Sequence, residues 1–261
     1  MQLVDIGANL THESFRHDLD AVLCRAVEHG VSTMLVTGAS REGSEQALAL
    51  ARAHPGLLHA TAGVHPHHAI DYDDATDARL RELLADEAVK ATGECGLDYF
   101  RNYSPHDVQI AAFERQLQIA ADCGKPLFLH QRDAHADFLA CLDAMRGKLP
   151  RAVVHCFTAD REELSHYLER DFHIGLTGWI CDERRGTHLR EIVGMIPSDR
   201  LMIETDAPYI LPRDLPQKVA NRRNEPMFLP HICAAVAAAR GEEVEETAAR
   251  TTATARAFFG L

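Results

Sequence analysis

The sequence predicts an α/β protein with the fold of a (β/α)₈ barrel, and three observations lead to this. Short apolar runs alternate with longer segments of helical periodicity, eight such pairs fit into 261 residues, and no change in composition marks a linker. Strands that are apolar almost throughout are typical of a parallel sheet covered by helices. Barrels of this kind commonly have about 250 residues. We therefore expect one barrel domain over residues 1–261.

The predicted strands are short runs of β-branched and apolar residues, and the predicted helices between them repeat apolar residues at intervals of three or four. In chain order, the strands are expected at residues 3–6, 33–37, 57–64, 89–93, 126–130, 152–157, 172–177 and 201–204. The helical pattern is found around residues 21–27, 47–51, 80–84, 113–120, 138–145, 164–168, 189–196 and 232–239, and a further helix is expected over residues 244–259.

Composition excludes several classes of protein. A hydrophobic content of 46% argues against disorder, and no apolar run reaches the roughly 20 residues that span a bilayer. The N-terminus lacks the basic start and apolar middle of a signal peptide. The seven cysteines form no C-x-x-C pair, so neither a disulfide framework nor a zinc ribbon is expected. We predict a cytoplasmic protein without membrane contacts, and we take it to be a monomer.

Charge limits the kind of nucleic-acid binding that is possible. Lys and Arg total 27 against 39 Asp and Glu, a formal net charge of −12. This excludes a protein that coats nucleic acid through bulk electrostatics, because such affinity comes from basic residues that neutralise phosphates. A protein that grips only a few phosphates remains compatible with this charge.

Four metal-binding residue types follow predicted strands at corresponding points. Glu94, His130, His155 and Asp206 end strands four, five, six and eight, one or two strand–helix units apart. In a barrel, the C-terminal strand ends meet at one rim, where active sites form. A single histidine there is more often structural, but two imidazoles and two carboxylates together are a ligand set for a divalent cation.

These residues belong to five motifs that resemble the TatD family of metal-dependent deoxyribonucleases. In order, the motifs are GVHPH at 63–67, GECGLD at 93–98, HQRD at 130–133, HCFT at 155–158 and ETDAPY at 204–209. The resemblance covers essentially the whole chain. It implies a TIM barrel of the metal-dependent hydrolase type that hydrolyses phosphodiesters as a 3′→5′ exonuclease on single-stranded DNA or RNA ends, with a role in DNA repair or degradation.

The resemblance also implies a cofactor, namely a divalent metal ion. We expect Mg²⁺, with Mn²⁺ and Zn²⁺ as alternatives. Glu94, His130 and His155 match the family's metal ligands, and Asp206 matches a further acidic residue of the centre. Many relatives carry an H-x-H pair after strand one, where this chain has Gly7 and Asn9. We therefore predict one firm metal site and leave a second site open.

Three catalytic roles follow as hypotheses. Glu94 acts through the metal, and Asp206 accepts the proton of the attacking water. His65 is expected to hydrogen-bond the phosphate or the leaving oxygen. The alternative for His65 is a histidine bonded to backbone at the rim of the barrel.

Candidate substrate contacts lie after strands five, seven and eight. Arginine suits bidentate phosphate contacts, and an aromatic ring can stack a base without reading sequence. The candidates are Arg132, Arg222, Arg223 and Asn224 for phosphates and Trp179 and Tyr209 for bases. The alternative is that these arginines and rings only hold the loops together.

Two other functions remain open. One is a metal-dependent amidohydrolase-type enzyme that acts on a substrate other than nucleic acid. The other is a non-catalytic barrel that binds a partner. The missing H-x-H pair disfavours the first, and the cluster of ionisable strand-end residues disfavours the second.

Overall fold

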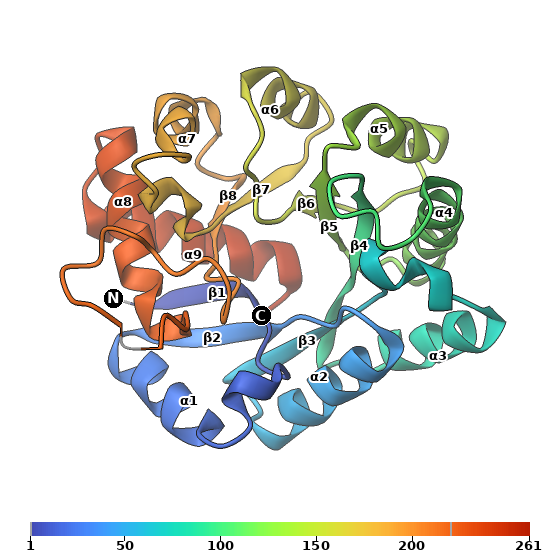
Figure 1. Ribbon diagram of the computed structural model, residues 1–261, viewed down its shortest axis with the longest axis horizontal. Helices are drawn as coiled ribbons and strands as arrows, with labels where there is room; N and C mark the ends of the chain where they lie inside the picture. The colour runs from blue at the N-terminus through green and yellow to red at the C-terminus, as the bar shows by residue number, and fades with distance from the viewer. Residues whose placement is uncertain (1, 220) are drawn as a thin grey trace. The chain divides into compact units, whose positions relative to one another are not determined.

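The structure is a computed structural model that describes residues 2–219 and 221–261. Its strands form one eight-stranded sheet in the order β1 to β8, as the sequence predicts (Figure 1). The pairs that β3 makes with β4, β4 with β5, β5 with β6 and β7 with β8 are parallel. The strands are β1 (Leu3–Ala8), β2 (Val31–Val36), β3 (Leu58–Ala62), β4 (Val89–Asp98), β5 (Leu127–Arg132), β6 (Ala152–Val154), β7 (His173–Leu176) and β8 (Leu201–Ile203).

Helices alternate with these strands. The α-helices are α1 (Leu19–Glu28), α2 (Arg41–Ala53), α3 (Asp74–Leu84), α4 (His106–Cys123), α5 (His135–Ala144), α6 (Arg161–Leu168), α7 (Thr187–Ile192), α8 (Leu229–Arg240) and α9 (Val244–Phe259). Short 3₁₀ helices are η1 (Glu13–Phe15), η2 (Pro66–Asp71), η3 (Gly178–Cys181), η4 (Val193–Met195) and η5 (Pro226–Phe228). No helix of the described residues is long and apolar enough to cross a membrane.

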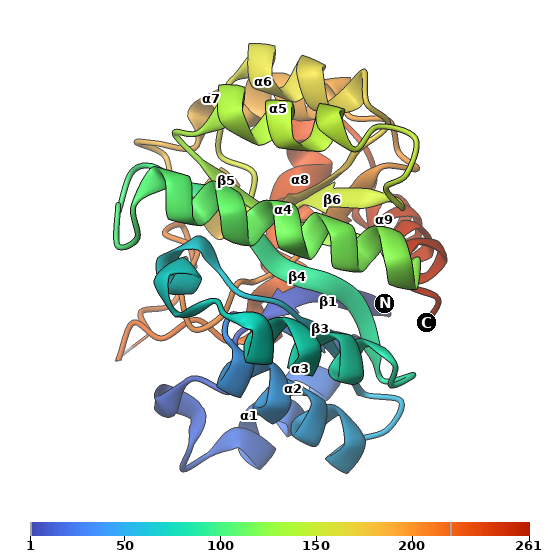
Figure 2. The same cartoon turned by 90° about the vertical axis from the view of Figure 1, so that its right-hand side faces the viewer.

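The chain divides into two compact units. The first unit is Met1–Leu35 with Cys156–Leu261, and the second unit is Val36–His155. In the first unit, α9 packs on β1 and β8 and buries Phe258 and Phe259. In the second unit, α2 packs on β3 and α4 packs on β4, while neighbouring helices from α2 to α5 lie side by side (Figure 2). The single domain predicted for residues 1–261 stays a prediction.

Strand β4 is the element whose observed bounds matter most for function. The sequence predicts that it ends at residue 93, but the strand continues to Asp98, so Glu94 lies within it. The register against β5 shifts between Thr92 and Cys95. Gly96, at φ +145°, allows this close pairing, because a Cβ there would lie 1.8 Å from the carbonyl oxygen of His130. Strand β6 is shorter than predicted, and His155 lies just beyond its end.

Candidate metal centre and substrate site

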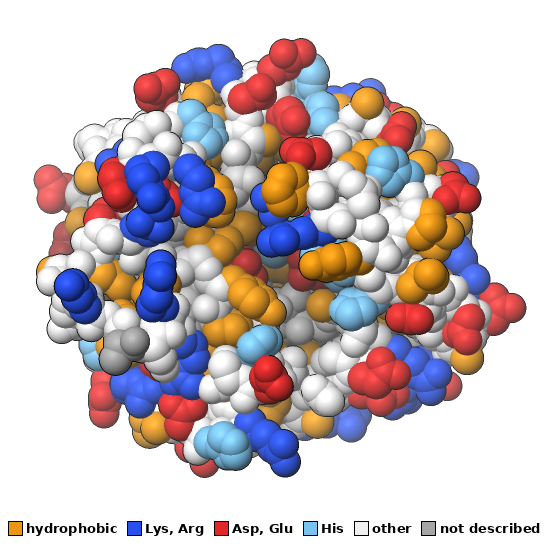
Figure 3. Space-filling view, in the orientation of Figure 1, with side chains coloured by type: hydrophobic (Ala, Val, Ile, Leu, Met, Phe, Trp, Pro, Cys, Tyr) orange, Lys and Arg blue, Asp and Glu red, His pale blue; other side chains and the backbone are white. Residues whose placement is uncertain are grey.

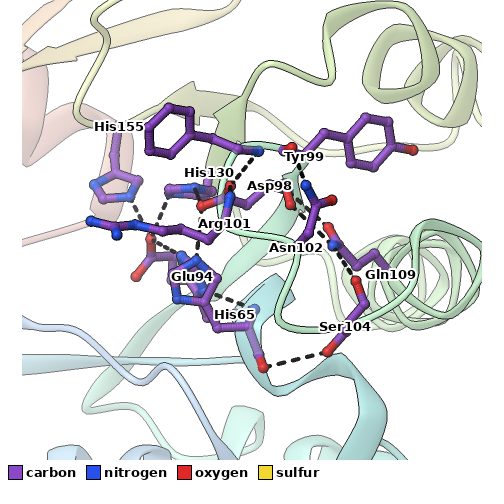
Figure 4. A network of polar contacts seen from close by, with 12 residues as sticks. His65, Glu94, Asp98, Tyr99, Arg101, Asn102, Ser104, Gln109, His130 and His155 are labelled. Carbon is purple, nitrogen blue, oxygen red and sulfur yellow. Dashed lines mark hydrogen bonds and ion pairs between the residues drawn. The ribbon is translucent and has the colours of Figure 1, made fainter.

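Three imidazoles surround one carboxylate oxygen in the second unit (Figure 4). The Oε1 atom of Glu94 lies 2.7 Å from Nε2 of His155, 3.1 Å from Nδ1 of His130 and 3.4 Å from Nε2 of His65. Glu94 is 6% exposed. The donor atoms of His65, Glu94 and His130 lie within 4.8 Å of one another. The structure thus brings together His65, Glu94, His130 and His155, the four predicted metal and catalytic residues of this unit.

The charge state of this cluster suits a cation. Burial alone would raise the pKa of Glu94, but the neighbouring His155 and His65, with the hydrogen bonds from His130 and His155, outweigh burial and hold it well below its usual value. Burial lowers the pKa of His65 far below its ordinary value and outweighs the attraction of Glu94. The cluster therefore offers an ionised carboxylate at Glu94, as a divalent cation requires of a carboxyl ligand, beside a neutral imidazole at His65.

A second carboxylate supports the imidazoles. Asp98 is 1% exposed, and its Oδ2 lies 2.8 Å from Nε2 of His67 and 3.4 Å from Nε2 of His130. Burial would raise the pKa of Asp98, but hydrogen bonds with His130 and His67 lower it well below its usual value. Burial alone would lower the pKa of His130, but its two carboxylate neighbours, Asp98 and Glu94, raise it. Asp98 therefore orients one ring nitrogen of His130 while the other faces Glu94.

Helix α4 holds the segments that carry these groups. Its buried Gln116 accepts a hydrogen bond from the N–H of Val64 and donates to the carbonyl of Val64, at 2.7 and 3.0 Å. Its buried Gln109 likewise accepts a hydrogen bond from the N–H of Asp98 at 2.8 Å and donates to the carbonyl of Asp98 at 3.0 Å. The two glutamines are seven residues apart and share one helix face. Each thus pairs with the backbone of a segment that presents a site residue.

His65 has a defined tautomer. Its Nδ1 accepts a hydrogen bond from the N–H of His67 at 3.1 Å. In a neutral ring, the proton is then on Nε2, which faces Glu94. An imidazole with this tautomer is a hydrogen-bond donor at Nε2 rather than a metal ligand. His65 therefore combines both sequence hypotheses: one ring nitrogen is bonded to backbone, and the other can donate.

Asp206 lies in the first unit, where a neighbouring amide fixes its carboxylate. The side chain of Asn9 donates to Oδ1 of Asp206 at 2.9 Å, and the N–H of Asp206 donates to the carbonyl of Gly7 at 2.8 Å. The backbone of Asp206 has φ +53°, an uncommon conformation for a residue with a side chain. Gly7 and Asn9, the positions that differ from the H-x-H pair, thus position Asp206.

A cavity of about 490 Å³ lies in the first unit, between η3 and the segment that connects β8 to η5. The cavity is lined by the aromatic ring of Trp179 and by four basic residues, Arg185, Arg213, Lys218 and Arg222. The Arg185 guanidinium lies 4.4 Å from the Trp179 ring centroid and covers one face. Figure 3 shows Lys and Arg side chains gathered on the face that η3 and this segment occupy in Figure 1. Trp179 and Arg222, two predicted substrate residues, thus line one basic cavity.

The other predicted substrate residues have different surroundings. In the second unit, the Arg132 guanidinium stacks on the exposed Phe100 ring at 3.7 Å. In the first unit, Tyr209 is 51% exposed, and its ring meets His12 edge to face. Both side chains are accessible to a ligand.

Arg223 and Asn224 are occupied by the protein itself. Arg223 donates to the carboxylates of Asp18 and Glu225 and is 12% exposed in its side chain. The buried amide of Asn224 donates to the carbonyls of Thr205 and Tyr209, at 2.8 and 2.7 Å. These contacts give both residues a structural role in the β8 connection, and they compete with the phosphate contact predicted for them.

Sequence reasoning missed the supporting residues of the site. Asp98 is the last residue of the GECGLD motif. It lies four residues after Glu94 in the same strand, a spacing that puts both side chains on one face. That spacing could have identified it. Arg101, also labelled in Figure 4, donates its backbone N–H to Oδ1 of Asp98 at 2.8 Å. Gln109 and Gln116 carried no signal, because a polar residue on a helix is usually exposed.

Comparisons with known proteins identify relatives along nearly the whole chain. A profile of the family described as "TatD related DNase" matches residues 4–260. The protein named "3'-5' ssDNA/RNA exonuclease TatD" from Erwinia amylovora is 52% identical over 259 residues, which are 99% of this chain and 100% of that protein. The protein of the same name from Enterobacter lignolyticus is 51% identical, covering 99% of each chain.

Solved structures share the fold. A TatD homologue from Escherichia coli K12 superposes with a TM-score of 0.90 at 26% identity, covering 99% of this chain and 98% of that one. A TatD family hydrolase from Entamoeba histolytica gives a TM-score of 0.89 at 25% identity, with coverage of 99% and 98%. The predicted (β/α)₈ barrel fold is confirmed.

Proposed function

Because the chain belongs to the TatD-related DNase family, we propose that it is a metal-dependent 3′→5′ exonuclease that acts on single-stranded DNA or RNA ends. The observation that carries this proposal is the buried Glu94 carboxylate among His65, His130 and His155. A family name alone would not show that this chain keeps the chemistry. An ionised carboxylate held by imidazoles supports it directly.

The donor set fits a divalent cation, with Mg²⁺ as the proposed ion and Mn²⁺ and Zn²⁺ as alternatives. Glu94, His130 and His155 would hold it, and Asp206 keeps the further acidic role that the family resemblance gives it. When bound, the ion would polarise a phosphoryl oxygen and lower the pKa of water. One site is proposed on these grounds, and a second ion would depend on Asp206 and Asn9.

The chain's own residues supply the remaining steps. Nε2–H of His65 donates a hydrogen bond to a phosphate oxygen or to the leaving oxygen, because its Nδ1 is already committed to the His67 backbone. Asp206 accepts the proton of the attacking water on a carboxylate that Asn9 orients. Neither step needs a charged histidine.

The decisive experiment uses metal-stripped protein, 3′-labelled single-stranded DNA and added Mg²⁺. We expect mononucleotide release to fall at least about 100-fold in Glu94→Gln, since losing a residue that merely supports a ligand already costs about 10–100-fold. His155→Ala should lower mononucleotide release to a similar extent. Glu114→Gln, on the exposed face of α4, is the matched control and should keep wild-type release.

Three outcomes would contradict the proposal. Equal release from Glu94→Gln and wild type would indicate a contaminating nuclease. Metal-dependent turnover of an amide or lactone without nucleotide release would instead favour the amidohydrolase-type alternative. No metal-dependent turnover of any of these substrates would favour a binding protein.

We further propose that the basic cavity of the first unit receives an unpaired nucleotide. The exposed face of Trp179 would stack the base, and Arg222 would contact a phosphate. Arg132 and Tyr209 are proposed as further contacts, whereas Arg223 and Asn224 keep their structural role. Stacking on an aromatic ring is worth about 1–3 kcal/mol, so Trp179→Ala should raise the KM for an oligonucleotide by roughly 5- to 150-fold.

The control for Trp179→Ala is a small phosphodiester without a base to stack. Its KM should stay within about twofold of the wild-type value. A similar rise in KM for both substrates would show that Trp179 supports the fold of the loops instead of binding a base.

The proposal includes a cytoplasmic monomer that meets strand ends during DNA repair or degradation. None of the seven cysteines of the described residues forms a disulfide, as a reducing compartment favours. Two of them, Cys24 and Cys123, are exposed.

A further inference from the structure

A second cluster of metal-binding side chains lies in the first unit, separate in sequence from the histidines around Glu94. Cys181 ends η3, Asp214 lies in the segment between β8 and η5, and His231 is in the first turn of α8. The ligand atoms of these three residues all lie within 4.8 Å of one another. We name this group the Cys181 cluster.

We propose that the Cys181 cluster is a binding site for a divalent transition-metal ion of the Zn²⁺ class. Thiolate sulfur, imidazole nitrogen and carboxylate oxygen are all Zn²⁺ ligands, and thiolate excludes Mg²⁺ as the preferred ion. With ordinary Zn²⁺ bond lengths, tetrahedral ligands lie roughly 3.3–3.6 Å apart. In the structure, the ligand atoms of the cluster all lie within 4.8 Å of one another, which is close to that spacing.

Exposure at the cluster suits an open site. Cys181 is 0% exposed, whereas the side chains of Asp214 and His231 are 41% and 29% exposed. The buried sulfur is thus shielded, and the two partly exposed ligands provide a path for the ion. Three protein ligands leave a fourth tetrahedral position for water.

The charges of the ligands can balance the charge of a divalent ion. Nε2 of His231 lies 2.6 Å from Oδ1 of Asp214, while Arg190 lies 3.9 Å from Oδ2. Arg190 therefore faces the oxygen that the histidine does not use. The thiolate is the form of cysteine that binds a metal ion, so binding releases the thiol proton of Cys181 to solution. The resulting thiolate and carboxylate balance the two positive charges of the ion.

The position of the cluster suggests what a bound ion would do. Trp179 and Asp182 flank Cys181, and Arg213 and Leu215 flank Asp214, and all four line the basic cavity. A metal ion would therefore fix η3, the β8 connection and α8 to one another beside the cavity wall. This role is structural, and the site is independent of the proposed nuclease centre.

The test is a titration of the metal-stripped full chain with Co²⁺ as a probe for Zn²⁺. Co²⁺ bound to a thiolate absorbs in the near ultraviolet, and the nuclease ligands Glu94, His130 and His155 offer no sulfur. We expect this band in wild type, its loss in Cys181→Ser, and its displacement by Zn²⁺. Loss of a first ligand should weaken Co²⁺ binding by more than the roughly 10–100-fold that supporting residues cost.

Controls separate this site from other thiols and from the nuclease centre. Cys156→Ser, beside His155, and Cys233→Ser, at another buried thiol, should keep the band, and so should Glu94→Gln. His231→Gln changes a partly exposed residue and should weaken Co²⁺ binding without loss of folding, measured by thermal melting. A wild type with no thiolate band at saturating Co²⁺, or a band that survives Cys181→Ser, would overturn the proposal.

Discussion

Two buried carboxyl groups on strands, Glu94 on β4 and Asp5 on β1, have similar exposure and different neighbours. Glu94 is 6% exposed and Asp5 is 0% exposed. Glu94 is surrounded by imidazoles. Asp5 accepts hydrogen bonds from the backbone N–H groups of Gly7 and Thr205, at 3.2 and 2.9 Å, and from the Thr205 hydroxyl at 2.5 Å.

The neighbours decide the charge of each group. Burial raises the pKa of Asp5 to about 7, because the hydrogen bonds from Thr205 and Gly7 offset only part of its cost. Burial acts on Glu94 in the same direction, yet the imidazoles reverse the shift and keep it ionised. A buried carboxylate is therefore a candidate metal ligand only where cationic or ligand-forming neighbours keep its charge. Glu94 meets this condition, and Asp5 is a structural group.

The largest effect expected from this difference is on how stability depends on pH. The pKa of Asp5 is raised from 3.8 to about 7 in the folded state, so the folded protein binds this proton more tightly than the unfolded chain. Its contribution to stability is full below about pH 4 and is lost as pH rises through 7. In Asp5→Asn, the free energy of unfolding relative to wild type should rise by about 3 kcal/mol between pH 4 and pH 7.

Chemical denaturation at both pH values measures this change. The matched control is Asp18→Asn, a partly exposed aspartate whose hydrogen bond with Arg223 lowers its pKa. A lowered pKa reverses the sign, so Asp18 loses its contribution as pH falls below 4 and should have no effect between pH 4 and pH 7. An Asp5→Asn variant that keeps the wild-type pH dependence would show that Asp5 is ionised, and the contrast with Glu94 would fail.

The sequence predicts the barrel well because periodicity is a local property. Eight apolar runs identified eight strands, with bounds that mostly differ by one to three residues from those observed. The exception is β4, which is predicted to end at Gly93 and continues to Asp98. In the structure, the absence of a Cβ at Gly96 lets the chain pair closely with β5 and continue. A glycine in a sequence is compatible with the end of a strand and with a strand that continues in close pairing. Which of the two occurs depends on the neighbouring strand.

The candidate site was predictable where its residues lie in the C-terminal part of a strand or just after it. Glu94, His130 and His155 could be identified because parallel strands end at a common rim. The Cys181 cluster could not, because its members come from a 3₁₀ helix, a connection and an α-helix, with no shared period. Arg223 could not be resolved from residue type, since its partners Asp18 and Glu225 are set by tertiary structure and compete with the predicted phosphate contact. The type of a residue indicates which contacts its side chain can make, whereas the fold determines which partners it meets.

A smaller effect tests the group that keeps the imidazoles in place around Glu94. Asp98→Asn keeps the oxygen that accepts from the N–H groups of Phe100 and Arg101, but it replaces the charged oxygen that faces His67 and His130. Supporting carboxylates of this kind raise the affinity of a metal-bound histidine. We expect the Mg²⁺ concentration for half-maximal activity to rise by about 10–100-fold, with little change in melting temperature.

The matched control for Asp98→Asn is Asp137→Asn, which removes a carboxylate that accepts from the Tyr99 hydroxyl at 2.8 Å on an exposed surface. Its Mg²⁺ dependence should be that of wild type. If Asp98→Asn lowers the melting temperature but leaves the Mg²⁺ dependence unchanged, Asp98 only stabilises the β4 connection. Glu94 would then stay ionised through its direct imidazole contacts alone, and those contacts would be sufficient to explain its difference from Asp5.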